Sequence, residues 1–379
     1  MSTEEKELNT EERELNTNKV GVLKKWLKIA GISLTVIIMS ICLGFYILIV
    51  SGLFPNIQEL WVTTAMTTFS HKWLAEAFID DETIKEIMER VYVDDTGYET
   101  DVSLIGGNKQ QVVETLPIEE VEEDKESIPM IELQPAINKE GTYTEQGYTK
   151  MEDGIWFKEA SGNGWRGYLL MVEDPSRVSI AQTRYQFSRG DLIKTLVPLH
   201  EARVGINAGG FVDGPNYDSN GGQPAGLLVV NGEIIQSNGS TKHSVIGFNE
   251  DNVLVLGKMT RQEVIEANIR DAVDFRPFLI VNGETVIKEG NGGWGIAPRT
   301  ALGQRETGEV IFFCVDGRQV HSIGVDIRVL QDVLYEEGCI NAAMVDGGSS
   351  TVMYHVEKGY LNNPSLGHER YINNCWLVK

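Results

Sequence analysis

CINAAMVDGGSSTVMYH, at residues 339–355, is the stretch that decides the fold and points to a site. Its apolar first half is typical of a buried β-strand, and that run stops at Asp346. Two glycines and three hydroxyl residues follow, as in a tight turn. A second stretch, VIFFCVDGRQV at residues 310–320, ends its apolar run in the same way at Asp316. Two buried strands that each deliver an aspartate to a glycine turn predict one shared site.

Length and charge limit the classes of protein to consider. A chain of 379 residues has room for one large domain or two ordinary ones, with appendages. Its formal net charge is −22, whereas a surface that binds nucleic acid gathers Lys and Arg. We therefore expect no nucleic-acid partner.

An apolar segment near the N-terminus predicts a membrane anchor. No charged residue occurs from Ile29 to Gln58, which is long enough to cross a bilayer as one helix. Four lysines stand between residues 19 and 28, and Glu59 is the first charge on the other side. Positive residues stay in the cytoplasm, so we expect a single-pass protein with a cytoplasmic N-terminus and an extracellular catalytic domain. A cleavable signal peptide would have a shorter apolar region and a small-residue cleavage site, and neither is evident.

Composition changes along the chain predict its organisation. The segment after the anchor indicates two helices, the second capped by Asp80 or Asp81. The stretch LPIEEVEEDKESIPMIELQP then combines seven acidic residues with three prolines, as in an extended linker. We expect the following parts: a disordered cytoplasmic tail at 1–28, a transmembrane anchor at 29–54, a helical juxtamembrane region at 55–105, an acidic linker at 106–147 and a catalytic domain at 148–379.

Short apolar runs broken by Gly, Asn and Asp fill the last part of the chain. Asn-Gly between apolar runs predicts hairpins at 225–235 and 276–287, and a longer turn predicts a third at 245–257. We expect GYLLMVED and RVSIAQ to be neighbouring strands. Helices are expected at about 190–200, in TRQEVIEANIRDAV and in DIRVLQDVLYEEG. Many hairpins with a few inserted helices predict an α+β fold whose mixed sheet is mostly antiparallel.

Several familiar motifs lack the sequence context that their function requires. GNGGWG at 290–295 fits the dinucleotide pattern GxGxxG, but no helix opens after it, so a mobile glycine loop is the better interpretation. HEARV at 200–204 lacks the second histidine of a zinc protease. Neither CxxC nor an EF-hand spacing occurs, and we expect no metal and no cofactor. Cys314, Cys339 and Cys375 are interpreted as buried free thiols.

Polar residues that follow apolar strands in glycine-rich surroundings form the candidate site. Each fragment alone is ordinary turn chemistry, but plain turns do not require an Arg or Asp directly after a fully apolar strand. Arginine binds phosphate oxygens through a planar fork, and carboxylates and amides hold sugar hydroxyls. The pattern therefore suits a substrate that is both hydroxylated and anionic. The candidates are Asn207, Gly209, Gly210, Arg299, Thr300, Asp316, Arg318, Asp346, Gly347, Gly348, Ser349, Ser350, Glu369 and Arg370.

Five motifs in order, INAGGF, RTALG, VDGR, VDGGSSTVM and NNPSLGHER, resemble the phosphodiester glycosidase family across residues 150–379. That family includes the uncovering enzyme of the mannose-6-phosphate pathway and bacterial membrane-anchored proteins linked to exopolysaccharide. The resemblance implies cleavage of a sugar-1-phosphodiester at the anomeric carbon. SST here replaces the family's more usual Gly-Ser-Thr, which tightens the turn at Ser349. The pocket residues that the resemblance implies are Asn207, Arg299, Asp316, Arg318 and Asp346.

Such chemistry needs a cationic clamp on the phosphate and a carboxylate near the anomeric carbon, as a base for water or as a nucleophile. Arg299, Arg318 or Arg370 would supply the clamp, and Asp316 and Asp346 are the candidate catalytic carboxylates. Three hypotheses stay open. The first is an ectoenzyme that hydrolyses α-linked N-acetylamino-sugar phosphodiesters of envelope glycopolymers or exopolysaccharide. The second is a non-hydrolytic protein that binds or assembles exopolysaccharide. The third is a serine esterase acting through Ser349 or Ser350.

Overall fold

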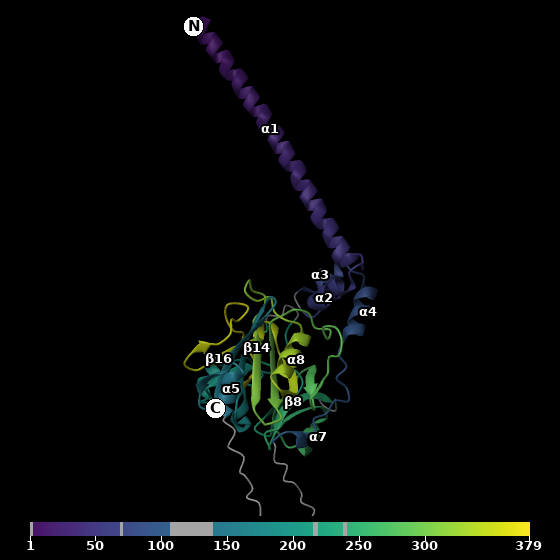
Figure 1. Cartoon of the computed structure of the whole chain (residues 1–379), viewed down its shortest axis with the longest axis vertical. Helices are drawn as coiled ribbons and strands as arrows, with labels where there is room; N and C mark the ends of the chain where they lie inside the picture. Colours follow the sequence, from purple (N-terminus) through teal and green to yellow (C-terminus); the bar gives the residue numbers. More distant parts are fainter. Residues whose placement is uncertain (1–2, 69–70, 107–138, 215–218, 238–240) are drawn as a thin grey trace, which may run out of the picture.

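The computed structural model describes residues 3–68, 71–106, 139–214, 219–237 and 241–379 (Figure 1). The helices are α1 (Thr3–Phe45), α2 (Pro55–Met66), α3 (Trp73–Glu76), α4 (Asp81–Val91), α5 (Lys139–Glu145), α6 (Ile193–Leu199), α7 (Arg261–Glu266) and α8 (Ile327–Glu336). Most of the predicted acidic linker, residues 107–138, lies outside the described residues. Its last part forms α5, and the strands begin at Thr149.

The strands form three sheets whose pairings are antiparallel, which confirms the predicted fold class. The eight-stranded sheet has the order β1 (Thr149–Glu152), β2 (Ile155–Gly162), β3 (Trp165–Val172), β14 (Val310–Val315), β13 (Arg299–Arg305), β15 (Cys339–Val345), β11 (Phe278–Val281) and β12 (Glu284–Thr285). One five-stranded sheet has the order β7 (Glu233–Gln236), β6 (Leu228–Val230), β10 (Ile269–Asp274), β8 (His243–Asn249) and β9 (Leu254–Met259). The other has the order β17 (Gly359–Tyr360), β16 (Met353–His355), β5 (Val204–Asn207), β18 (Asn374–Val378) and β4 (Val178–Gln182).

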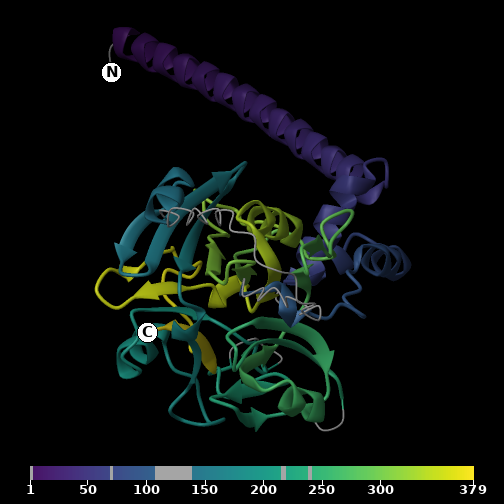
Figure 2. The ribbon, with the colours of Figure 1, turned by 60° about the horizontal axis from the view of Figure 1, so that its bottom comes forward.

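The central core lies where the three sheets face one another, because its buried side chains come from all of them. Strand alternation decides which residues enter it. On β15, Ala343 and Val345 point into this core, whereas Ala342 and Met344 point to the opposite face, which α8 covers. Figure 2 shows α8 lying across its sheet. The outer faces of the two smaller sheets have clusters of their own beneath α6 and α7.

Helix α1 projects from the rest of the molecule (Figure 1). In the described part of the chain, one helical segment is long and apolar enough to span a membrane, the 27 residues Lys24–Val50. The prediction of a disordered tail was wrong, because α1 already begins at Thr3. No glycine or proline interrupts the chain from Thr3 to Val20, and Glu, Lys and Leu favour helix there.

The juxtamembrane region forms a small helical cluster joined to the end of α1. It contains three helices rather than the predicted two, since α3 lies between α2 and α4. The cap of α4 is Asp80, whose carboxylate accepts the Thr83 amide at 2.9 Å. The Phe45 ring packs edge-on against Trp61 and Phe78, at centroid distances of 5.4 and 4.9 Å. The end of the apolar span is therefore packed against these helices, and is not joined to them by the chain alone.

All three predicted hairpins are confirmed, as β6–β7, β8–β9 and β11–β12. The pairing of GYLLMVED with RVSIAQ was wrong. The first forms β3, which pairs with β2 and β14, and the second forms β4, which pairs with β18 in another sheet. A 3₁₀ turn at Pro175–Arg177, with Asp174 as its cap, redirects the chain between the two sheets. An apolar run alone does not specify its partner.

The predicted helix at 260–273 is shorter than expected, and its second half is β10. Helix α7 ends at Glu266, and Asn268 has a φ of +50°, a left-handed conformation that helices do not continue through. The predicted thiols are confirmed. Cys314, Cys339 and Cys375 are all free and buried.

Strand β13 determines where the two aspartates emerge. It pairs antiparallel with β14 on one side and with β15 on the other, so β14 and β15 run parallel to each other. Asp316 and Asp346 directly follow these two strands and therefore lie at the same edge of the sheet. With one strand between them, the two backbones are separated by about 9.6 Å, twice the usual strand spacing.

The glycine-rich loop at 290–295 is packed against α2, which does not fit the expected mobile loop. The Asn291 side-chain nitrogen donates to the Thr63 hydroxyl at 2.8 Å, and the Ile296 backbone amide donates to the Thr64 hydroxyl at 3.1 Å. At Gly295 a Cβ atom would lie 2.3 Å from the Thr64 backbone, so only glycine allows this approach. The loop thus joins the juxtamembrane helices to the sheet.

We predict that Gly295→Ala separates α2 from the loop, because the added methyl group overlaps backbone that cannot rotate away. The full chain in detergent should show faster amide hydrogen exchange in α2 and a lower melting temperature. Gly31→Ala is the control, since nothing lies within 4 Å of its Cβ position in α1. Unchanged exchange in α2 would contradict the contact.

Candidate active site

Asp346 begins the turn that follows β15 and is partly buried. Its amide donates to the Ala208 carbonyl at 2.9 Å, and its side chain accepts the Gly347 amide at 2.9 Å. The next residue, Gly348, has a φ of +60°, which glycine adopts without strain. The backbone therefore fixes the carboxyl group at the sheet edge.

Two arginines flank this turn. The Arg370 guanidinium lies 4.8 Å from the Phe211 ring centroid and donates through Nη2 to both Asp213 oxygens, at 3.1 and 3.3 Å. Its Nη1 lies 3.5 Å from the Ser349 hydroxyl, a weak contact within the turn itself. Asp213 and the aromatic ring thus hold the guanidinium in one orientation beside the Asp346 turn.

Arg318 reaches the turn from the loop that follows β14, the strand on the other side of β13. It is exposed, and a Cβ atom on Gly348 would lie 3.5 Å from its Nη2 atom. Its φ is +59°, a strained conformation for a residue with a side chain. Gly317 precedes it, at a position where a Cβ would overlap Pro298. The strained backbone keeps this guanidinium over the Asp346 turn.

The Asp346 environment disfavours its charged form. Burial raises the pKa of this carboxyl to about 6, against the opposing effects of the Ser350 hydroxyl and of Arg370. The group is therefore mostly ionised at pH 7.5 and mostly neutral at pH 5. A carboxyl poised in this way can exchange a proton near neutral pH.

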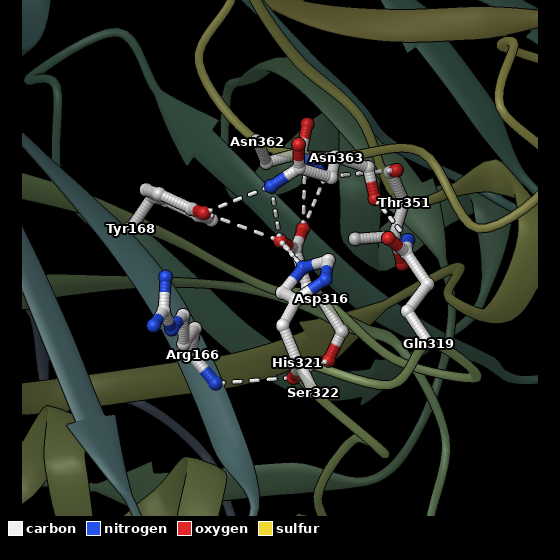
Figure 3. A network of polar contacts seen from close by, with 9 residues as sticks. All are labelled: Arg166, Tyr168, Asp316, Gln319, His321, Ser322, Thr351, Asn362 and Asn363. Atoms are coloured by element: carbon white, nitrogen blue, oxygen red, sulfur yellow. Dashed lines mark hydrogen bonds and ion pairs between the residues drawn. The ribbon is translucent and has the colours of Figure 1, made fainter.

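Asp316 has a different environment, shown in Figure 3. It is 1% exposed and has five hydrogen-bond contacts. Oδ1 accepts the Asn363 amide at 2.8 Å and the Asn362 side chain at 3.2 Å. Oδ2 lies 2.7 Å from the Asn363 side-chain nitrogen and 3.2 Å from both the Tyr168 hydroxyl and His321 Nε2. A carboxylate with this many partners holds its neighbours in place and has little capacity left for substrate.

His321 is the most accessible titratable member of this network, with a side chain that is 36% exposed. Gln319 and Ser322 close the short loop that carries it, because their backbones bond to each other at 3.0 and 3.1 Å. Tyr168 remains a donor, since burial and the nearby Asp316 charge raise its pKa to about 12. The network therefore orients the His321 ring at the edge that Asp346 shares.

Several predicted residues lie beneath this edge as structural contacts. Asn207 donates to the Asp346 carbonyl and accepts from the Thr300 hydroxyl at 2.8 Å and the Val352 amide at 3.2 Å. Cβ atoms at Gly209 and Gly210 would approach Val273 at 3.0 Å and Phe275 at 3.3 Å. These residues fix the strand ends on which the site stands.

Two predicted residues point elsewhere. The Arg299 guanidinium is buried on the opposite face of the sheet, where it donates to the carbonyls of Gly295 and Val325. Burial lowers its pKa to about 10, so it stays charged at neutral pH. Glu369 accepts the Ile193 amide at 2.7 Å at the start of α6. The Arg299 Cδ atom lies 3.8 Å from the position of a Cβ on Gly347, but the guanidinium and the Glu369 carboxylate make these hydrogen bonds away from Asp346. Their proposed contact with substrate stays a prediction.

Reasoning from the sequence missed three contributors, Asp213, Tyr168 and His321. Asp213 stands four residues after Gly209, inside the glycine-rich segment, and His321 stands five residues after Asp316, so both had a local signal. Tyr168 lies 148 residues before Asp316 and had none. The Thr351 and Ser365 hydroxyls are buried without a partner in the described part of the chain. A bound polar ligand or water would satisfy them.

Other kinds of site find less support here. In the described ranges, no group of three or more His, Cys, Asp or Glu side chains is arranged to hold a metal ion. Within the same ranges, the hydroxyl of Ser349 contacts Arg370 and no histidine. Surface hollows of about 370 and 690 Å³ lie on α4 and between α5 and β2, and share no residue with the Asp346 edge.

We predict that Asp346→Asn raises the melting temperature at pH 7.5 but changes it little at pH 4. The folded state binds this proton more tightly than the unfolded chain, so stability is lost as the pH rises from about 4 to 6. The neutral amide removes that loss, and a domain of about 150–250 residues gains about 2–4 °C in melting temperature for each kcal/mol of stability. Asp251→Asn, at an exposed turn, is the control. An equal shift at both pH values would contradict the buried-carboxyl explanation.

Comparison with known proteins gives a family match for the second half of the chain. Residues 200–379 match the sequence model of the phosphodiester glycosidase family. The SPbeta prophage-derived uncharacterized protein YomE of Bacillus subtilis (strain 168) is 43% identical over 75 residues, which are 20% of this chain and only 12% of that protein's length.

Solved structures show a similar fold. The catalytic domain of zebrafish N-acetylglucosamine-1-phosphodiester alpha-N-acetylglucosaminidase, auto-inhibited by its pro-peptide, superposes with a TM-score of 0.50 at 21% identity, over 59% of this chain and 81% of that one. A hypothetical protein from Synechocystis gives a TM-score of 0.49 at 13% identity, over 61% and 63% of the two chains. Through residues 200–379, the chain belongs to the phosphodiester glycosidase family.

Proposed function

We propose that the protein hydrolyses a sugar-1-phosphodiester, with an α-linked N-acetylamino sugar as the substrate class, by cleaving the bond between the anomeric carbon and oxygen. The observation that carries this proposal is the Asp346 carboxyl, poised near neutral pH between Arg318 and Arg370. Two guanidiniums suit the phosphate, and the carboxyl group suits the sugar carbon beside it. Family membership supports the same assignment.

In the proposed reaction, the two arginines and Asp346 have different tasks. The phosphodiester is already anionic, so the site has to neutralise its charge and supply a proton on the phosphate side as the bond to the sugar breaks. Arg318 and Arg370 bind the phosphate oxygens. Asp346, when ionised, takes the proton of an attacking water or attacks the anomeric carbon itself. The products are a reducing sugar and a phosphomonoester.

His321 and Asp316 form the second functional pair in this proposal. His321 transfers a proton on the phosphate side, and Asp316 is a positioning residue that holds the ring through the 3.2 Å contact. This refines the sequence-based hypothesis, in which Asp316 was itself catalytic. The five contacts of Asp316 favour the positioning role.

We further propose that the chain is a single-pass membrane protein with residues 1–28 in the cytoplasm and the catalytic domain outside. The apolar helix and the lysines before it support this orientation. A domain held there would meet phosphodiester-linked sugars of envelope glycopolymers or exopolysaccharide.

The test of activity uses the full chain in detergent with methyl phosphodiesters of α-linked N-acetylglucosamine, glucose and galactose 1-phosphates. In ¹⁸O-labelled water, the label should enter the sugar and not the phosphate. We expect kcat/KM to rise with pH through about 6, as Asp346 ionises. Asp346→Asn should lower kcat/KM by at least ~10³-fold. His321→Gln should lower it by about 10²–10⁴-fold, chiefly through kcat.

Label found in the phosphate would make the protein a phosphodiesterase and refute the glycosidase. No sugar release, together with binding of a phosphodiester glycopolymer whose affinity Asp346→Asn alters, would favour the exopolysaccharide-binding hypothesis. Asp251→Asn is the matched control, because it removes an exposed carboxylate far along the chain from the sheet edge.

Orientation is tested by cysteine labelling in intact cells. Wild-type protein should not react with a membrane-impermeant maleimide, because Cys314, Cys339 and Cys375 are buried and Cys42 lies within the apolar span. Asp251→Cys should react before lysis, and Glu12→Cys only after it. The reverse pattern would place the catalytic domain inside the cell.

A further inference from the structure

Three side chains at one end of the five-stranded β7–β6–β10–β8–β9 sheet form a hydrogen-bonded chain. The Ser237 hydroxyl lies 3.0 Å from His243 Nε2, and His243 Nδ1 lies 2.7 Å from Asp274 Oδ2. Ser237 directly follows β7, His243 begins β8, and Asp274 ends β10. A nucleophile, a base and a carboxylate are thus placed in series.

The carboxylate at the far end of this chain is fixed. Asp274 Oδ1 accepts the Ser244 amide at 3.1 Å, while Oδ2 faces the imidazole. Gly226, with a φ of +73°, makes room for it, since a Cβ there would lie 2.2 Å from Oδ2. Both oxygens are therefore held before any substrate arrives.

This fixed carboxylate decides the state of the histidine. An acceptor 2.7 Å from Nδ1 keeps the ring proton on that atom. The lone pair of Nε2 then points at the Ser237 hydroxyl, which is the geometry of general-base activation. The His243 side chain is only 3% exposed, whereas Ser237 is partly exposed. The base is thus shielded from water, and the nucleophile is accessible.

These three residues belong to a different sheet from the strands that carry the proposed phosphodiester site. Asp274 and His243 lie on the face of their sheet that packs beneath α7, with Ala272 and Val245 as their neighbours two positions along. Asp346 follows β15 of the eight-stranded sheet. Ser349 and Ser350, the serines proposed from the sequence, lie in the turn that follows Asp346. Ser237 was not anticipated from the sequence.

We propose that Ser237, His243 and Asp274 form a second catalytic site that hydrolyses small O-acyl esters. The Ser237 oxygen bonds to the ester carbonyl carbon as its proton moves to His243 Nε2. The ester C–O bond then breaks, and that proton leaves with the alcohol. Water attacks the acyl-serine, gives one proton to His243 and releases the acid, after which Ser237 regains its proton. Ester and water become acid and alcohol, with no other reactant.

The alternative is a purely structural role, in which the three groups only close the connection between β7 and β8. The two roles differ in chemistry, because a structural hydroxyl does not react with electrophiles. An activated serine does, and its reactivity depends on the carboxylate two groups away.

The experiment treats the full chain in detergent with a fluorophosphonate probe and, separately, with p-nitrophenyl acetate. We expect one probe molecule per chain, attached to Ser237 in the peptide map, and ester hydrolysis with an initial burst. Ser237→Ala should abolish both, and Asp274→Asn should slow labelling by ~10³-fold or more, as expected for the wrong imidazole tautomer. Ser161→Ala, at an exposed serine of β2, is the matched control and should label normally.

Melting temperatures of all variants show whether each is folded. No labelling of folded wild-type protein, or undiminished labelling of folded Asp274→Asn, would overturn the proposal and leave a structural hydrogen-bond chain. Attachment of the probe to any other serine would overturn it as well. The result is independent of the glycosidase assay, because neither substrate contains a sugar phosphodiester.

Discussion

The antiparallel pairing of β13 with both of its neighbours is the constraint on which the candidate active site depends. It makes β14 and β15 parallel, so that two strands distant in sequence end at one edge. The two loops that carry several of the polar residues at that edge follow from this pairing. The loop that carries Arg318 and His321 continues β14, and the turn that carries Ser349 continues β15. A shift of either strand by one residue would turn its aspartate to the opposite face.

The two aspartates look equivalent in sequence, because each ends an apolar strand and precedes glycine. The structure gives them opposite surroundings. Asp316 is saturated with hydrogen bonds from Tyr168, His321 and the 362–363 segment, whereas burial leaves the Asp346 carboxyl poorly stabilised when charged. Paired carboxyl groups with different environments take different roles, and the poorly stabilised one is suited to proton exchange. The cost in stability is therefore borne at Asp346, the carboxyl group suited to proton exchange.

Local patterns predicted the parts of this fold that local chemistry controls. Asn-Gly turns marked hairpins correctly, and the two apolar runs that end in Asp-Gly are strands that end at one edge of the sheet. Partner choice between distant strands was not readable, as β3 and β4 show, because apolar runs of similar length are interchangeable until the whole sheet is assembled. The side-chain direction of Arg299 also escaped prediction. It occupies the first position of β13, where strand alternation turns it to the face opposite Thr300.

The contact between Gly295 and Thr64 limits how far the sheets can move relative to the end of the apolar helix. The helical cluster is packed on the end of the apolar span, and the same cluster is fastened to the sheet by the 290–295 loop. A domain attached by a flexible tether samples a hemisphere above its anchor, whereas one attached at two points keeps a set height and tilt. If the chain is the membrane-anchored enzyme that we propose, it would search for substrate by lateral diffusion in two dimensions. It would act on bonds at one depth of a surface polymer layer and spare the same bonds nearer to or farther from the membrane.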